Sequence, residues 1–378
     1  MKKIILRILG NSTFGSFVAS LVSIILGLLL GLIVMYIFNP RGAWPGFITM
    51  LQGGFSDGAR GIGQVLYYTT TLILVGLSVG FSFQTGLFNI GVIGQFTMGA
   101  YVAIIIGGKL ELPASIHWIV ALLGASIAGM LWALLPGILK AYAKVSEIIT
   151  TIMMNYVALY WVNQLVFDTH YEKSTVMSAY VKKTALMPKI GFDQIFPGSS
   201  VNSGLLIAIA VAIIISVVLY KTTFGYSLRA CGANREASRY AGINENRNII
   251  MVMLIAGLIA GLAGGILYLS AITKNYKISE LFINEPAYGI PVALLGISDP
   301  MGIILASVFI GYIIIGGSLM QGYGFPVETV NIITAVIIYF AAFSLIFKNM
   351  LGKLVLRESF KDATEKTSPR RIPFPWKR

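Results

Sequence analysis

Long apolar runs separated by short polar segments dominate the chain. A helix that crosses the roughly 30 Å hydrocarbon core of a bilayer needs about 20 apolar residues, and the pattern predicts about ten helical segments. They cover residues 14–38, 61–83, 87–106, 117–139, 147–167, 203–220, 248–271, 287–298, 301–319 and 327–347. The eighth is too short to cross alone, which predicts a broken span. We therefore expect an all-α polytopic transmembrane bundle over residues 1–347, followed by a basic tail over 348–378.

Composition and charge agree with a membrane protein. Hydrophobic residues make up 56% of the chain and charged residues 11%, whereas soluble domains carry about 25% charge. Nineteen of the 28 Lys and Arg residues fall in alternate polar segments, namely 1–13, 140–146, 221–247 and 348–378. Since basic loops stay in the cytoplasm, both termini and the 222–247 loop are predicted to be cytoplasmic. The formal net charge of +13 then reflects orientation and contact with anionic lipid, and nucleic-acid binding is not expected.

A glycine-rich region at 61–108 predicts a break in the helices. Residues 86–100 contain four glycines, which let helices break or approach closely. Broken helices in transporters often line the translocation path, and Phe88, Asn89 and Gln95 offer ring and amide groups there. The alternative is that these amides form hydrogen bonds between helices and only hold the bundle together.

A second polar group lies on the 147–167 segment. Thr151 and Asn155 share one helical face by the 3.6-residue period, and Tyr156 follows. This stripe suits a solute that forms hydrogen bonds and stacks on rings, although the same residues could serve in packing. Gly257, Gly261 and Gly265 have the spacing of a helix-packing face.

Other chemistry is not expected. Glu147 and Glu328 are the only charged residues within the predicted spans and lie near span ends, which argues against a proton- or cation-driven carrier. Asp299 precedes a proline and predicts a helix N-cap. The two histidines have no partners at metal-ligand spacing, and no catalytic constellation is evident. The single cysteine, Cys231, excludes an intrachain disulfide and is expected to be packed inside the 222–247 loop.

Three segments carry a resemblance to a known family. They are GLFNIGVIGQFTMGAY at 86–101, VSEIITTIMMNYVALY at 145–160 and TTFGYSLRACGANREASRYAGIN at 222–244. In this order they resemble the permease subunits of bacterial nucleoside and simple-sugar ABC importers, part of the ribose and branched-chain amino-acid permease group. The similarity covers about residues 60–347, and the first segment is nearer the nucleoside branch. The family usually has an acidic residue where this chain has Ile93, which implies shifted specificity or reliance on a partner subunit.

The resemblance implies a complex in the bacterial plasma membrane. Two permease subunits, often non-identical, would sit on a two-domain ABC ATPase and receive solute from an extracytoplasmic lipoprotein that binds it. The chain has no GxxxxGK[ST] phosphate loop, so ATP is expected on the partner ATPase, and the chain is expected to be non-catalytic with no cofactor of its own. The outer loop at 168–202 is a candidate contact for the binding protein or a plain surface excursion.

In that family context, residues 222–247 would be the coupling loop. The short helix from Arg235 to Ala241, bounded by Gly232 and Gly242, would be seated in the ATPase. The implied coupling residues are Arg229, Gly232, Asn234, Arg235, Glu236, Arg239, Ala241 and Gly242. The alternative is an ordinary basic loop that only fixes orientation.

The expected function is thus the permease subunit of an ABC importer for nucleosides. The candidate path residues are Phe88, Asn89, Gln95, Thr151, Asn155 and Tyr156. One alternative keeps the class and changes the cargo to a simple sugar or branched-chain amino acid. Another is a secondary solute carrier.

Overall fold

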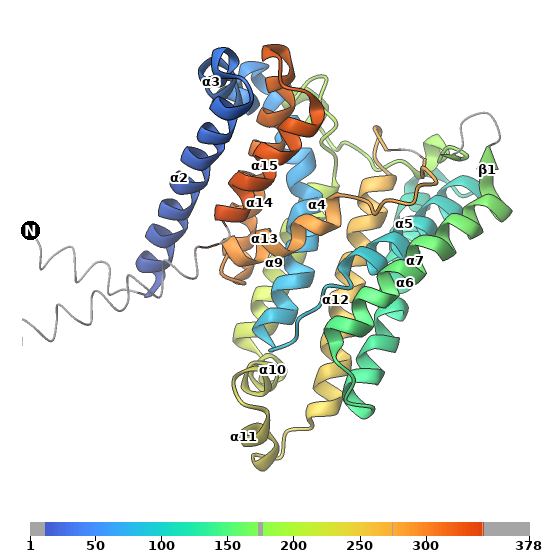
Figure 1. Ribbon diagram of the computed structural model, residues 1–378. Helices are drawn as coiled ribbons and strands as arrows, with labels where there is room; N and C mark the ends of the chain where they lie inside the picture. Colours follow the sequence, from blue (N-terminus) through green and yellow to red (C-terminus); the bar gives the residue numbers. More distant parts are fainter. Residues whose placement is uncertain (1–11, 173–176, 274, 342, 344–378) are drawn as a thin grey trace, which may run out of the picture.

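The computed structural model describes residues 12–172, 177–273, 275–341 and 343, and their architecture is a helical bundle (Figure 1). The longer helices are α2 (Ser12–Phe38), α3 (Pro40–Ser56), α4 (Gly58–Gln84), α5 (Val92–Lys109), α6 (Ala114–Tyr142), α7 (Glu147–His170), α9 (Gly204–Lys221), α10 (Thr223–Ala233), α12 (Glu245–Tyr268), α14 (Pro300–Leu319) and α15 (Val327–Ala341). The short elements are β1 (Tyr171–Glu172), β2 (Met177–Ser178), η1 (Lys183–Ala185), α8 (Phe192–Ile195), α11 (Arg235–Tyr240), η2 (Glu285–Tyr288), α13 (Gly289–Leu295) and η3 (Met320–Tyr323). The two strands pair antiparallel, with Tyr171 opposite Ser178.

Seven of the described helices are long and apolar enough to cross a membrane: α2, α4, α5, α6, α9, α12 and α14. This confirms an all-helical, multi-pass membrane protein. Helix α7 has 24 residues but is not among these seven, α15 is shorter, and α13 has seven residues. The count of about ten spans and the cytoplasmic placement of both termini therefore remain predictions. The predicted tail over 348–378 lies outside the described residues.

One predicted boundary is wrong, and one helix was not predicted. The helix expected from residue 87 begins at Val92, because residues 85–91 leave the helical path at Gly86, whose φ of +73° is left-handed. The stretch 39–60, which lies between two predicted spans, contains α3. Asn39 caps that helix by accepting a hydrogen bond from the Gly42 amide at 3.1 Å, and Pro40 occupies the first helical position.

Helix α12 forms the centre of one half of the bundle and packs against α4, α5 and α6. Small residues permit this close packing. A Cβ added to Gly261 would lie 3.0 Å from the Cα of Gly129 on α6, and one added to Gly99 on α5 would lie 2.5 Å from the Cα of Gly261. The predicted helix-packing role of Gly261 is therefore confirmed.

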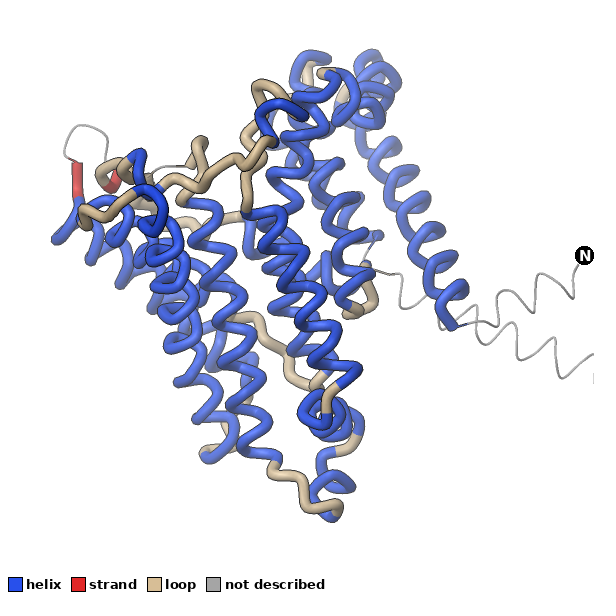
Figure 2. Tube along the Cα trace, turned by 180° about the vertical axis from the view of Figure 1, so that it is seen from behind, coloured by secondary structure: helices blue, strands red, loops and turns tan. Residues whose placement is uncertain are grey.

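Two breaks between helices, and a pair of short helices at one end of the bundle, form the candidate site. The first break, residues 85–91, runs from the lower end of α4 to α5 (Figure 1). The second break, residues 296–299, joins α13 to α14, and α13 packs against α4. Helices α10 and α11 lie at the end of the bundle away from β1 and β2, as both views show (Figures 1 and 2).

Candidate functional site

The first break is held by a buried pair of amides. Asn89 and Gln95 are 0% and 1% exposed. The Asn89 amide donates to Gln95 Oε1 at 3.2 Å, and the Gln95 amide donates to Asn89 Oδ1 at 3.3 Å. Asn89 Oδ1 also accepts from the Gly91 N–H at 2.9 Å. Because buried amides need partners, this pair satisfies itself and fixes the backbone just before α5 begins.

Asn155 fastens the same region to α7. Its Oδ1 accepts from the Gly94 N–H at 2.8 Å, and its Nδ2 donates to the Ile90 carbonyl at 3.1 Å. Gly94 packs closely here, since a Cβ on it would lie 3.1 Å from the Cα of Asn155. One side chain therefore joins the end of the first break and the first turn of α5 to α7.

The six predicted path residues separate into two groups. Thr151 donates its hydroxyl to the Glu147 carbonyl at 2.6 Å, so that the four polar residues Asn89, Gln95, Thr151 and Asn155 all form hydrogen bonds within the protein. Phe88 and Tyr156 are instead 40% and 46% exposed. Asn89, Gln95 and Asn155 thus hold the break in this conformation, whereas Thr151 bonds within its own helix, and the two rings are the candidates for contact with a solute.

Replacing Asn155 with alanine is expected to weaken the fold and uptake together. The change leaves the Gly94 N–H and the Ile90 carbonyl without a partner, at about 1–3 kcal/mol for each group that stays unpaired. The thermal midpoint of the purified protein in detergent checks this, with Gln164→Ala, an exposed change on the same helix, as the control. Uptake lost at an unchanged midpoint would instead make Asn155 a direct solute contact.

The 222–247 loop folds into two capped helices. Thr222 caps α10 by accepting from the Gly225 N–H at 3.0 Å, and Asn234 caps α11 by accepting from the Ala237 N–H at 3.0 Å. Gly242 follows α11 with a left-handed φ of +79°, as expected for a residue that ends a helix. Gly232 does not bound α11 as predicted, because it lies within the last turn of α10.

Gly232 and Arg235 connect this loop to the first break. A Cβ on Gly232 would lie 2.8 Å from the carbonyl carbon of Thr85, and one on Gly86 would lie 2.7 Å from the Cα of Gly232. Arg235 donates from Nη2 to the Gly86 carbonyl at 3.2 Å. The two backbones are thus in direct contact, and α11 is attached to the break through its first residue.

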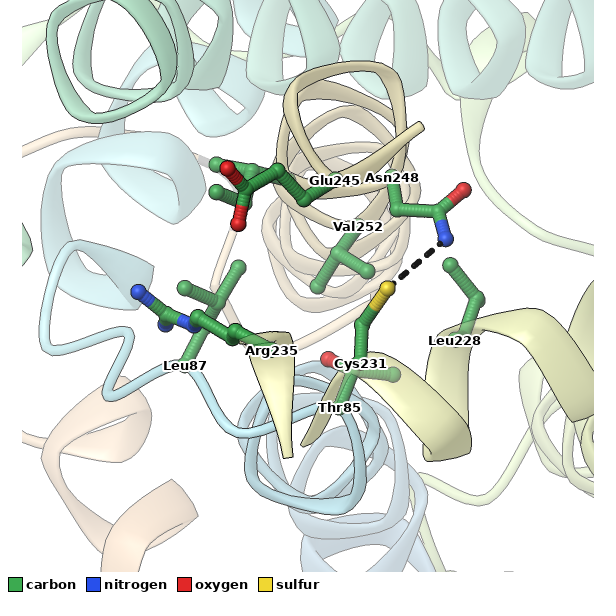
Figure 3. Close-up of a pocket in the computed structure, with 9 residues that line it drawn as sticks. Thr85, Leu87, Leu228, Cys231, Arg235, Glu245, Asn248 and Val252 are labelled. Atoms are coloured by element: carbon green, nitrogen blue, oxygen red, sulfur yellow. Dashed lines mark hydrogen bonds between the residues drawn. The ribbon is translucent and has the colours of Figure 1, made fainter. Parts of the chain in front are cut away.

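A small cavity lies beside this contact, between the first break, α10 and the start of α12 (Figure 3). Its lining includes Thr85, Arg235 and Glu245. Cys231 is 7% exposed and accepts a hydrogen bond from Asn248 Nδ2 at 3.3 Å, which is drawn as the dashed line in Figure 3. Cys231 is therefore packed inside the loop, as the sequence predicted.

A series of side-chain contacts that begins at Arg229 links the loop to the second break. Its guanidinium lies 5.2 Å from the ring centroid of Tyr220, a cation–π distance. The Tyr220 hydroxyl donates to Asp299 Oδ1 at 3.0 Å, and Asp299 caps α14 with its other oxygen, as predicted. Gln84 also donates to the Ser298 carbonyl at 3.3 Å, which joins the ends of the two breaks. Sequence reasoning missed Tyr220 because it reads as an ordinary residue at the end of a span.

The remaining coupling residues predicted by the resemblance face away from the bundle. Asn234, Glu236, Arg239, Ala241 and Gly242 are exposed. Tyr240, which was not singled out from the sequence, is 95% exposed at the end of α11. A large exposed ring beside charged groups is typical of residues that anchor protein–protein contacts. The loop thus has an inner side on the breaks and a free outer side.

Known proteins resemble the chain over most of its length. It is 38% identical to the guanosine ABC transporter permease protein NupP of Bacillus subtilis, over 88% of this chain and 95% of the relative. It is 33% identical to the nucleoside ABC transporter permease protein NupB of Lactococcus lactis, over 88% and 92%. It is 32% identical to the glucose ABC transporter permease protein TsgB13 of Haloferax volcanii, over 76% and 77%.

Further matches define the family. The first two organisms also have second permease proteins, NupQ and NupC, that resemble the chain more weakly. No solved structure matches it significantly. A family model described as "Branched-chain amino acid transport system / permease component" matches residues 61–342, which include both breaks and the 222–247 loop. The chain therefore belongs to this family of permease components.

Proposed function

We propose that the chain is a permease subunit of an ATP-binding-cassette importer that carries nucleosides into the cell. The observation that carries this proposal is the similarity over nearly the whole chain to permease proteins named for guanosine and for nucleosides. The proposed solute-facing region consists of the first break and the adjoining part of α7. The rings of Phe88 and Tyr156 are exposed there, and the amide side chains of the same region are buried. Neutral aromatic rings, one of which carries a hydroxyl group, suit an uncharged heterocyclic solute.

The proposal includes partners. The 222–247 loop, placed in the cytoplasm by the basic-residue bias, presents the outer side of α11 to a two-domain ATPase that binds ATP. A second, non-identical permease subunit completes the path, as the paired names NupP with NupQ and NupB with NupC suggest. A lipoprotein on the outer surface delivers the solute, with the 168–202 loop as its candidate contact. This chain itself is non-catalytic and holds no cofactor.

The contacts of the loop supply a mechanism for coupling. When the ATPase closes around ATP, it displaces α11, and the close packing of Gly232 on Gly86 transmits this displacement to the first break. The line from Arg229 through Tyr220 to Asp299 transmits it to the second break. The ATPase thereby biases the populations of inward- and outward-facing states.

Uptake of radiolabelled guanosine and uridine tests the function. Cells with the complete importer are expected to accumulate both, and cells that lack only this chain are expected to lose that uptake. Unlabelled glucose, ribose and leucine serve as competitors, and none should block the labelled nucleosides. Nucleoside uptake that does not depend on the chain would overturn the proposal.

A sugar is the second candidate cargo, because the Haloferax volcanii relative is named for glucose. Chain-dependent uptake of labelled glucose, without nucleoside uptake, would keep the permease assignment and replace the cargo. Both of these ABC importer assignments can be separated from a secondary carrier by dissipating the membrane ion gradients while ATP is maintained. Uptake by a secondary carrier would stop, whereas uptake by an ABC importer would continue.

A further inference from the structure

An irregular segment returns across the bundle between α12 and α13. Residues 277–284 form the last part of the connection from α12 to η2 and adopt neither a helix nor a regular strand. The segment begins beside β2, where Met177 and Lys277 form an antiparallel bridge and the Ser178 N–H donates to the Tyr276 carbonyl at 2.8 Å. From there the chain runs back to α13 (Figure 1). Its first residue is thus fixed at the end of the bundle that carries the two strands.

Two contacts tie this segment to α7 at different heights. Asn163 Nδ2 donates to the Ser279 carbonyl at 2.8 Å. The Phe282 ring packs on Tyr156, with ring centroids 4.9 Å apart and ring planes at 59°. Asn163 and Tyr156 are about 10 Å apart along the helix, and three extended residues span about the same distance. The segment therefore runs inward along α7, from the level of Asn163 to that of Tyr156.

The depth of Phe282 restricts what can surround the segment. Tyr156 lies about 20 Å along α7 from the end at His170, near the middle of this 24-residue helix. Irregular backbone at membrane depth is tolerated only where it is buried in protein or lines a water-filled cavity. Glu280 and Asn284 are exposed, and such polar side chains do not favour a lipid-facing position. The segment therefore borders a water-filled space on the side of α7 where Tyr156 is exposed.

We propose that residues 277–284 are the outer gate of the solute path, and that Phe282 closes it by covering part of the Tyr156 ring. The inference rests on the proposed function, which makes Tyr156 a solute-facing ring, and adds the residue that controls access to it. The two ties to α7 are one hydrogen bond and one ring contact. When both break, the segment leaves α7 while the bridge to β2 holds its outer end, and a solute from outside reaches the ring of Tyr156.

The test measures access to a thiol placed beneath the gate. Met153 is 54% exposed and lies three residues before Tyr156, so Met153→Cys places the thiol on the same face of α7. Cells that carry the complete importer are treated with a membrane-impermeant methanethiosulfonate reagent of fixed positive charge, and labelling of the chain without Met153→Cys is subtracted. Adding Phe282→Ala is expected to raise the labelling rate about two- to tenfold, because losing one ring pair shifts the population of the open gate by about that factor.

Two control variants test whether the ring itself closes the gate. Leu281→Ala is the matched control, because Leu281 is the adjacent residue and is 79% exposed, and its replacement should leave the rate unchanged. Phe282→Tyr keeps the ring and should keep labelling slow. An equal rise in Leu281→Ala, or an unchanged rate in Phe282→Ala at a normal amount of protein in the membrane, would overturn the inference.

Asn163→Ala provides a second variant, which decides the inference if Phe282→Ala does not reach the membrane. It removes the hydrogen bond to Ser279 and should also speed the labelling of Met153→Cys. An unchanged rate there would count against the gate. Guanosine uptake by the same cells separates this inference from the proposed function. Chain-dependent guanosine uptake without faster labelling in the variants would overturn the gate alone, whereas faster labelling without such uptake would support the gate and overturn the nucleoside cargo.

Discussion

Replacing residues 235–241 with a Gly/Ser linker of equal length is expected to abolish uptake and association with the ATPase, while the chain still inserts into the membrane. The replaced segment contains α11 and its exposed ring Tyr240. It contributes to the bundle mainly through Arg235 and through Ser238, which is 4% exposed. The transmembrane helices are therefore expected to fold without it, since their packing lies elsewhere.

Co-purification of the ATPase with the tagged chain measures association, and guanosine uptake measures function. The control replaces α8, Phe192–Ile195, with a Gly/Ser linker, because this short helix lies at the other end of the bundle. The control should keep the ATPase bound. If the 235–241 variant retains normal uptake, α11 is not the coupling element, and the loop only orients the chain.

Gly232→Ala is expected to reduce uptake by about tenfold or more while the ATPase stays bound. The added methyl group would lie 2.8 Å from the carbonyl carbon of Thr85 and 2.9 Å from the amide nitrogen of Gly86. Because backbone atoms cannot yield as a flexible side chain would, α10 must move away from the first break. Coupling free energies between sites are typically 1–3 kcal/mol, or about 5- to 150-fold, and this change separates the two glycine backbones whose contact we propose transmits such coupling.

The informative readout is ATP hydrolysis measured beside uptake in reconstituted vesicles. Gly232→Ala should continue to hydrolyse ATP while transport falls, because α11 and its outer side are unchanged. Gly322→Ala is the control, since a Cβ there meets nothing within 4 Å. Hydrolysis and transport that fall in the same proportion would place the defect in ATPase binding rather than in transmission to the break.

Much of the helix pattern could be predicted from the sequence. The spans expected at 61–83, 203–220 and 301–319 end within about three residues of α4, α9 and α14, because long apolar runs leave little freedom in a bilayer. The cap at Asp299 was predictable from the proline that follows it. The shortness of α13 followed from the length of its apolar run.

What the sequence missed depended on contacts between distant segments. Residues 87–91 are apolar enough to continue a helix, but the packing of Thr85 and Gly86 on α10 and the hydrogen bond from α7 to Ile90 hold the segment in a break. Helix α3 was missed because its glycines and Pro45 resemble a connection. The sequence identified Asn89, Gln95 and Asn155 as candidate path residues. Only the fold shows that each of them forms hydrogen bonds within the protein.

The backbone of the second break has an energetic consequence. Ile297 and Ser298 both adopt left-handed conformations, each with a φ of +54°, and neither is a glycine. Such a conformation costs an L-residue about 1–2 kcal/mol, and the branched Cβ of isoleucine makes it especially uncommon. The link between α13 and α14 is therefore held in a strained backbone conformation. Any rearrangement that lets these two residues return to ordinary backbone angles recovers part of that energy, so the strain lowers the cost of leaving the conformation described.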